Sequence, residues 1–81
     1  MPMLVKIFTL KNGLETIEDV TAVRILSKDY NLLILKDYVA NIGKIEGAIE
    51  IEHDGGTTRM EDIVAYYLCN ENVFNLMLEG E

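Results

Sequence analysis

The chain has 81 residues, of which 14 are acidic and 7 basic, so its net charge is −7, and 49% of its residues are hydrophobic. A chain this hydrophobic is expected to fold, and its length predicts a single domain, residues 1–81. The negative charge argues against nucleic acid as a partner, because binding a phosphate backbone needs Lys and Arg to displace counterions.

Cysteine content and apolar runs bear on location. Cys69 is the only cysteine, so no disulfide can form within the chain, and its place in the apolar run IVAYYLC favours a buried structural thiol over a nucleophile. No apolar stretch reaches the roughly 18 residues of a membrane span, and MPMLVKIF lacks the pattern of a signal peptide. We therefore expect a cytoplasmic protein without a membrane span.

The first part of the chain predicts a hairpin. Residues 3–10 carry apolar groups on both faces of a predicted strand, which suits a strand inside a two-layer packing. Asn12-Gly13 follows and predicts a chain reversal, since a type I′ turn needs positive φ at both central residues. Residues 14–26 fit either a strand, which their β-branched alternation favours, or a helix capped by Thr16.

The middle of the chain predicts two strands joined by a corner. Residues 27–31 are polar and turn-like, and a short apolar run begins at Leu32. The chain is irregular through residues 36–38, and Gly43 and Gly47 mark places where a side chain would obstruct the backbone or where φ is positive. A strand is then predicted over residues 45–52, with Ile45, Ile49 and Ile51 facing inward and Glu46, Ala48, Glu50 and Glu52 facing outward.

Residues 58–69 are the main ambiguity. Thr58 and Glu61 have the spacing of a capping box and precede a helical stripe of apolar residues. The β-branched and aromatic content of IVAYY, followed by a polar gap and the run VFNLML, predicts strand, turn and strand instead. We favour the strands, which makes the chain an all-β protein, a small two-layer β-sandwich of about 7–9 short strands. The alternative is an α+β fold with a helix at 58–69.

The sequence predicts no catalytic residues, no cofactor site and no metal site. His53 is the only histidine and has no Ser or Cys close in sequence to activate, and the Gly-Gly turn that follows it lacks the Lys of a phosphate-binding loop. The nearby carboxylates belong to a predicted exposed strand face and are poorly placed to complete a metal site. We therefore expect that the protein is not an enzyme.

The order of the predicted elements resembles a known domain. An apolar strand, a corner, the strand segment 47–51, a Gly-Gly turn and a closing apolar hairpin are similar to the N-terminal β-sandwich domain of the F1 ATP synthase epsilon subunit. Residues 34–40, ILKDYVA, fall where that family has Ile-Leu-Pro-Gly-His-Ala-Pro, and residues 63–78 fall where it has its last two strands. The resemblance spans nearly the whole chain and implies a sandwich whose motif loop contacts the rotor.

Two functions fit these observations. The first is a non-catalytic protein–protein interaction module that binds another protein, or a copy of itself as a homodimer, through an apolar patch around Leu35, Tyr38 and Val39 or through an exposed strand edge. The second is a small acidic regulator or decoy that occupies a basic protein surface with spaced carboxylates. Those carboxylates are Glu46, Glu50, Glu52 and Asp54. Binding by the second kind of protein should weaken steeply with salt.

Overall fold

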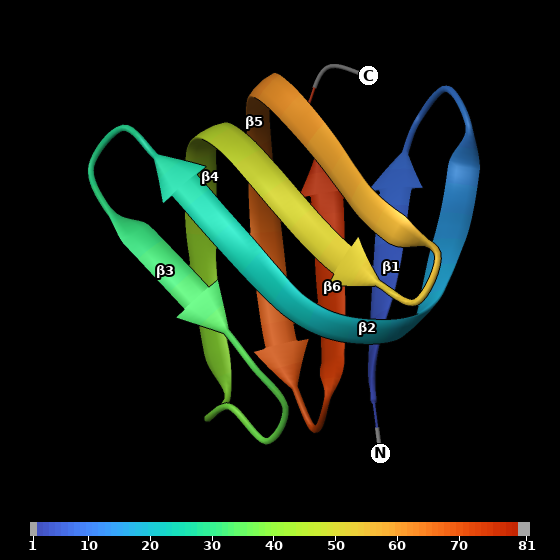
Figure 1. The fold of residues 1–81 in the computed structure, drawn as a ribbon. Helices are drawn as coiled ribbons and strands as arrows, with labels where there is room; N and C mark the ends of the chain where they lie inside the picture. The colour runs from blue at the N-terminus through green and yellow to red at the C-terminus, as the bar shows by residue number, and fades with distance from the viewer. Residues whose placement is uncertain (1, 80–81) are drawn as a thin grey trace.

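The computed structural model describes residues 2–79, and its regular structure there is entirely β-strand (Figure 1). The strands are β1 (Met3–Thr9), β2 (Gly13–Ser27), β3 (Asn31–Ile34), β4 (Asn41–His53), β5 (Gly56–Asn70) and β6 (Val73–Leu78). The prediction of an all-β protein is confirmed. The alternative with a helix at 58–69 is wrong, because that range lies within β5, which pairs with β4 on one side and β6 on the other.

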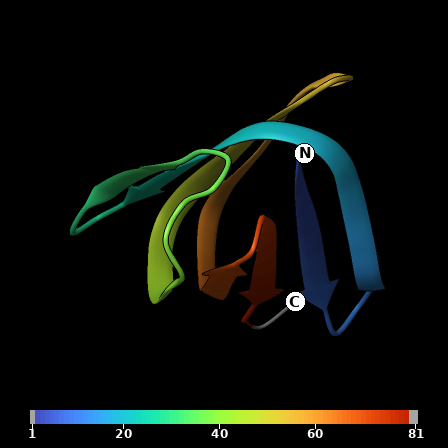
Figure 2. The same ribbon diagram turned by 90° about the horizontal axis from the view of Figure 1, so that it is seen from below.

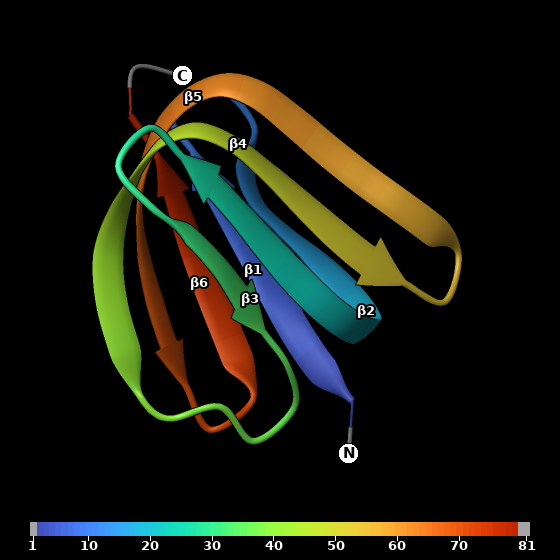
Figure 3. The same ribbon diagram turned by 60° about the vertical axis from the view of Figure 1, so that its left-hand side comes forward.

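All six strands belong to one sheet that closes on itself. The strand order is β1-β6-β5-β4-β2-β3, and β1 also pairs with β2, so β1, β2, β4, β5 and β6 form a five-stranded barrel. Neighbouring strands are antiparallel except β1 and β6, which are parallel. Figure 2 shows β2 arching across the barrel, and Figures 2 and 3 show β3 outside it, beside the second half of β2.

The predicted two-layer sandwich of about 7–9 short strands is therefore wrong, and the reason lies in the length and bending of the strands. β2, β4 and β5 have 15, 13 and 15 residues, and each borders different neighbours along its length. The register between β1 and β2 shifts near Asp19, which has φ 56°, and the register between β4 and β5 shifts near Asp62, which has φ 54°. Bulges of this kind bend a strand and increase its twist, so that one sheet curls into a barrel.

The predicted reversals are confirmed, although one has a different geometry from that expected. Three residues, Leu10 to Asn12, separate the paired Thr9 and Gly13, and the positive φ of 72° falls on Gly13. The Asn12 N–H donates to Thr9 Oγ1 at 2.9 Å. A two-residue turn with positive φ at both central positions occurs instead between β5 and β6, at Glu71 and Asn72.

Apolar side chains from the five barrel strands fill the interior, and Ile34 of β3 belongs to the same buried cluster. Ile45, Ile49 and Ile51 are fully buried, as predicted, whereas Ala48, which was expected to face outward, is also buried. Ala48 lies where the register shifts, with two residues of β5 opposite one residue of β4. The largest fully buried side chain is that of Phe74, whose ring stacks on Tyr67 with centroids 5.3 Å apart and planes 13° from parallel.

Tyr67 gives the barrel a measurable pH dependence. Burial, with a smaller effect of the nearby Tyr30, raises the pKa of the Tyr67 phenol to about 12, against roughly 10 in an unfolded chain. The folded protein thus holds this proton more tightly, and the stability it contributes is complete below pH 10 and lost as the pH rises from 10 to 12.

We expect the free energy of unfolding of the wild type to fall by about 2–3 kcal/mol more than that of Tyr67→Phe across this interval, since one pKa unit corresponds to about 1.4 kcal/mol. Urea titrations of both proteins at several pH values measure this difference. Absorbance at 295 nm should show one of the four tyrosines ionising late. Ionisation of Tyr67 near pH 10, seen as no difference between the titrations of the wild type and Tyr67→Phe above that pH, would contradict the burial of this phenol.

Candidate protein-binding surface

The three residues predicted to bind a partner lie in the segment between β3 and β4. Leu35 and Val39 are exposed, at 49% and 73%, whereas Tyr38 is half-buried and packs against the core. Asp37, with φ 63°, ties the segment to the β5–β6 turn: its N–H donates to Asn72 Oδ1 at 2.6 Å, and Asn72 Nδ2 donates to Asp37 Oδ1 at 3.1 Å. Two of the three side chains are thus exposed in this segment, and the third takes part in packing.

A larger apolar surface lies on the outer side of β1 and β6 and continues onto the adjoining parts of β2, β5 and β4. We call it the apolar face. Its large exposed side chains are Phe8, Leu14, Ile42, Tyr66, Leu68 and Met77, which are 43% to 74% exposed. A shallow groove runs across its centre, lined by Phe8, Leu14, Leu68 and Met77 together with Lys6 and Asn75.

The strand register shows that these residues are neighbours in space. Cross-strand partners form two adjacent rows of five residues on the outer side of the sheet. The first row is Leu14, Phe8, Met77, Tyr66 and Lys44, and the second is Thr16, Lys6, Asn75, Leu68 and Ile42. Side chains directly opposite one another on neighbouring strands are about 5 Å apart at Cβ, so each row is continuous. None of these ten positions is a carboxylate, although the chain has 14 acidic residues.

The only charges in the two rows are those of Lys6 and Lys44. Lys44 Nζ lies 5.6 Å from the centre of the Tyr66 ring and 3.8 Å from Glu46 Oε1, which belongs to the next row. Lys6 forms no ion pair with any residue in the range 2–79. Both charges within the apolar face are therefore positive, although the net charge of the chain is negative.

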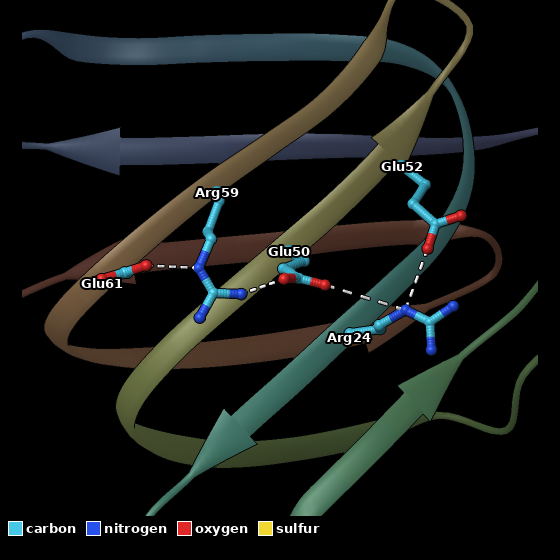
Figure 4. Close-up of polar contacts among 5 residues, drawn as sticks. All are labelled: Arg24, Glu50, Glu52, Arg59 and Glu61. Carbon is cyan, nitrogen blue, oxygen red and sulfur yellow. Dashed lines mark hydrogen bonds and ion pairs between the residues drawn. The ribbon is translucent and has the colours of Figure 1, made fainter.

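The charged residues of the sheet gather on a different part of the barrel, the outer side of β2, β4 and the first half of β5. Arg24 Nε lies 3.0 Å from Glu52 Oε2 and 4.0 Å from Glu50 Oε1 (Figure 4). Arg59 bonds to Glu50 on one side and, through Nε at 2.6 Å, to Glu61 on the other. The alternating signs follow from the register, which places Glu50 between Arg24 and Arg59.

This arrangement bears on the row of carboxylates expected to bind a basic partner. Glu50 and Glu52 are paired with arginine, and Glu46 Oε2 lies 3.1 Å from Lys28 Nζ, whose hydrogen bond and charge lower the pKa of Glu46. Asp54 is the remaining member and is exposed in the β4–β5 turn. A basic partner would have to displace the protein's own cations from three of these four carboxylates.

His53 and Cys69 carry groups that often serve in catalysis or metal binding, and they lie beside the β4–β5 turn and in the core. The Gly55 N–H donates to His53 Nδ1 at 3.2 Å, which leaves the proton on Nε2 facing Thr58 Oγ1 at 2.9 Å, so the imidazole braces the β4–β5 turn. Cys69 is buried, and burial raises the pKa of its thiol and disfavours the thiolate. Within residues 2–79 no three His, Cys, Asp or Glu side chains are grouped as a metal site would require.

Sequence reasoning missed the apolar face because its members come from five strands and are not contiguous. Residues 3–10 and the run VFNLML are apolar on both sides of the strand, whereas a strand with one buried face needs apolar residues on one side only. This excess of apolar residues was the available signal. That signal was assigned to burial between two layers, whereas the barrel has one interior and leaves the outer side of β1 and β6 uncovered.

Comparison with known proteins adds no family to this description. No protein-family model matches the sequence, and no curated protein matches it. The described part of the chain contains no helix with the length and apolar character needed to cross a membrane.

Proposed function

We propose that this chain is a non-catalytic protein-binding module and that the apolar face is its binding surface. The observation that supports the proposal is the continuity of six large, exposed apolar side chains across five strands without an intervening carboxylate. A large side chain has a surface on the order of 200 Å². Because about half of each is exposed, the six side chains together present roughly 600 Å² of apolar surface. That is the upper end of the largest patch on a typical monomer, about 300–600 Å², and such patches are often functional.

The charges of the face indicate the chemistry of its partner. Lys6 lines the groove and Lys44 lies at the β4 edge of the face beside Tyr66, so a complementary surface is apolar with carboxylates opposite these two lysines. A second copy is a poorer fit, since a two-fold interface would bring the lysines of both copies to one patch and join two chains of net charge −7. The expected partner is thus a different protein with carboxylates at these positions. An ATP synthase subunit is one candidate, on the sequence resemblance to the N-terminal domain of the epsilon subunit.

The size of the face agrees with a stable complex. A standard interface buries about 800 Å² on each partner, and its central part is about 65% apolar. The apolar face supplies the central part of such an area, and the surrounding polar residues of β2 and β4 supply a rim.

We also propose that the protein works in the cytoplasm, on the ground that its single cysteine forms no disulfide within the chain.

Replacing two central side chains, in the variant Phe8→Ser/Met77→Ser, should weaken partner binding at least 30-fold, because buried interface anchors each contribute roughly 1–2 kcal/mol or more. Proteins that the tagged wild type retains from lysate at high salt are identified by mass spectrometry, and the affinity of a purified partner is then measured by calorimetry. The matched control is Leu35→Ser/Val39→Ser, which removes the same kind of exposed group from the β3–β4 segment.

Each outcome of this comparison is informative. Loss of binding in the Phe8/Met77 variant alone supports the apolar face, and loss in the Leu35/Val39 variant alone moves the site to residues 35–39. A partner that binds both variants as tightly as the wild type, or that high salt releases, contradicts the proposal and favours the acidic regulator. If sedimentation shows that the wild type is a dimer and the Phe8/Met77 variant a monomer, the partner of the apolar face is a second copy of the chain and not a different protein.

A further inference from the structure

Two half-strands on the barrel have no strand partner on one side, and both border the same opening. β2 pairs with β4 only from Val20 onward, so residues 13–19 have a partner on the β1 side alone. β5 pairs with β6 only from Ala65 onward, so residues 56–63 have a partner on the β4 side alone. Figure 1 shows these two half-strands, blue and orange, diverging from the β4–β5 turn, where the Asp54 N–H donates to the Asp19 carbonyl at 3.2 Å. We call this opening the seam.

A cavity of about 430 Å³ lies in the seam between the two half-strands. Its lining is mixed: four apolar residues, Ile7, Ile17, Met60 and Leu78, and five polar ones, Thr9, Asn12, Glu15, Thr16 and Thr58. Binding pockets for small groups measure roughly 300–1,000 Å³, so this cavity has room for an inserted side chain. A cavity with an apolar portion, bordered by unpaired backbone, suits an extended peptide, whose main chain pairs with an edge while alternate side chains point inward.

The charge of the seam is negative. Glu15, Glu18 and Asp19 on β2, Asp54 in the turn and Asp62 on β5 are all exposed, and none forms an ion pair with another described residue. The cations near the seam are Arg59 on β5, which is paired with Glu50 and Glu61, and Lys11 in the β1–β2 turn. Edge-to-edge pairing of two copies would bring these carboxylates together, which argues against a second copy as the occupant.

We propose that the seam binds an extended basic segment of a partner protein, which adds to an edge as a β-strand and places one apolar side chain in the cavity. Residues alternating with that side chain point outward, where Lys or Arg meets exposed carboxylates such as Glu18 of β2 and Asp54 of the β4–β5 turn, while Glu15 borders the cavity itself. This site is separate from the apolar face and does not depend on the function proposed for it.

The test uses the blocked peptide Lys-Val-Lys-Phe-Lys-Val-Lys, titrated into the labelled full-length chain at low salt. We expect it to bind at least tenfold more tightly than two control peptides: one with Pro in place of both Val residues, which removes two backbone donors, and one with Glu in place of every Lys. Amide hydrogen exchange should slow at residues 14–18 or 57–63 when the peptide is bound.

Matched variants separate the seam from general charge attraction. Glu15→Gln/Glu18→Gln should weaken peptide binding at least fivefold, whereas Asp29→Asn/Glu71→Gln, which removes two charges from distant turns, should change it less than twofold. Phe8→Ser/Met77→Ser should bind the peptide like the wild type. Equal binding of the Pro peptide, equal loss in both charge variants, or protection on β3 instead of the seam would overturn the proposal.

Discussion

Replacing Gly47 with alanine should lower the free energy of unfolding by about 3 kcal/mol or more, a large share of the roughly 4–12 kcal/mol expected for a domain of this size. Gly47 lies in β4 with φ 153°, and a Cβ added there would stand 2.3 Å from the Leu26 carbonyl oxygen. That oxygen belongs to the backbone of β2, the strand paired with β4 at this point. The clash therefore has to be relieved by separating two paired strands and not by turning a side chain.

Gly55→Ala is the control for this measurement. A Cβ at Gly55 would meet only the His53 ring, at 3.4 Å, which is an ordinary contact. Urea unfolding followed by circular dichroism should place Gly55→Ala within about 0.5 kcal/mol of the wild type. A Gly47→Ala variant as stable as Gly55→Ala would show that β2 and β4 do not approach each other this closely.

Replacing Phe74 with alanine should cost about 3–5 kcal/mol, the range for emptying the site of a buried phenylalanine. Phe74 is fully buried, and its ring stacks on Tyr67 of the neighbouring strand. It is also one of only two buried side chains in β6, the strand that joins β5 to β1 and so closes the barrel. Loss of this ring leaves a cavity at the closure of the barrel and removes the stacking partner of Tyr67.

Two comparisons test this explanation by the same unfolding measurement. Phe74→Leu keeps most of the apolar volume and should lose clearly less stability than Phe74→Ala. Met77→Ala, on the outer side of the same strand, should change stability by about 0.5 kcal/mol or less, because its side chain is half exposed. Equal losses for Met77→Ala and Phe74→Ala would contradict the assignment of these two residues to opposite sides of β6.

Several local features were predictable because neighbouring residues decide them. The alternation of Ile45, Ile49 and Ile51 identified the buried side of β4, and polar residues marked the turns at 10–12, 27–31 and 70–72. The long strands were harder to predict. Asp19 and Asp62 have positive φ in the middle of β2 and β5, and a bulge of this kind resembles a break in the sequence pattern although the strand continues through it.

The candidate binding surfaces also divide into residues that are close in sequence and residues that only the fold brings together. Leu35, Tyr38 and Val39 were proposed because they are close together in sequence, yet Tyr38 packs against the core and leaves only two apolar side chains exposed. Phe8 and Met77 are near opposite ends of the chain and become neighbours only because β1 and β6 pair in parallel. Glu50 likewise has two partners from other strands: Arg24 lies on β2 and Arg59 on β5.

By itself, the sequence determined that this chain forms β-strands, where most of them turn, and which side of β4 is buried, because those properties depend on propensity and alternation over a few residues. Only the tertiary structure decided that the strands form one closed barrel instead of two layers, since closure depends on bulges and on pairing between the two ends of the chain. Closure also decided which apolar residues remain outside, and thereby created the apolar face and the seam.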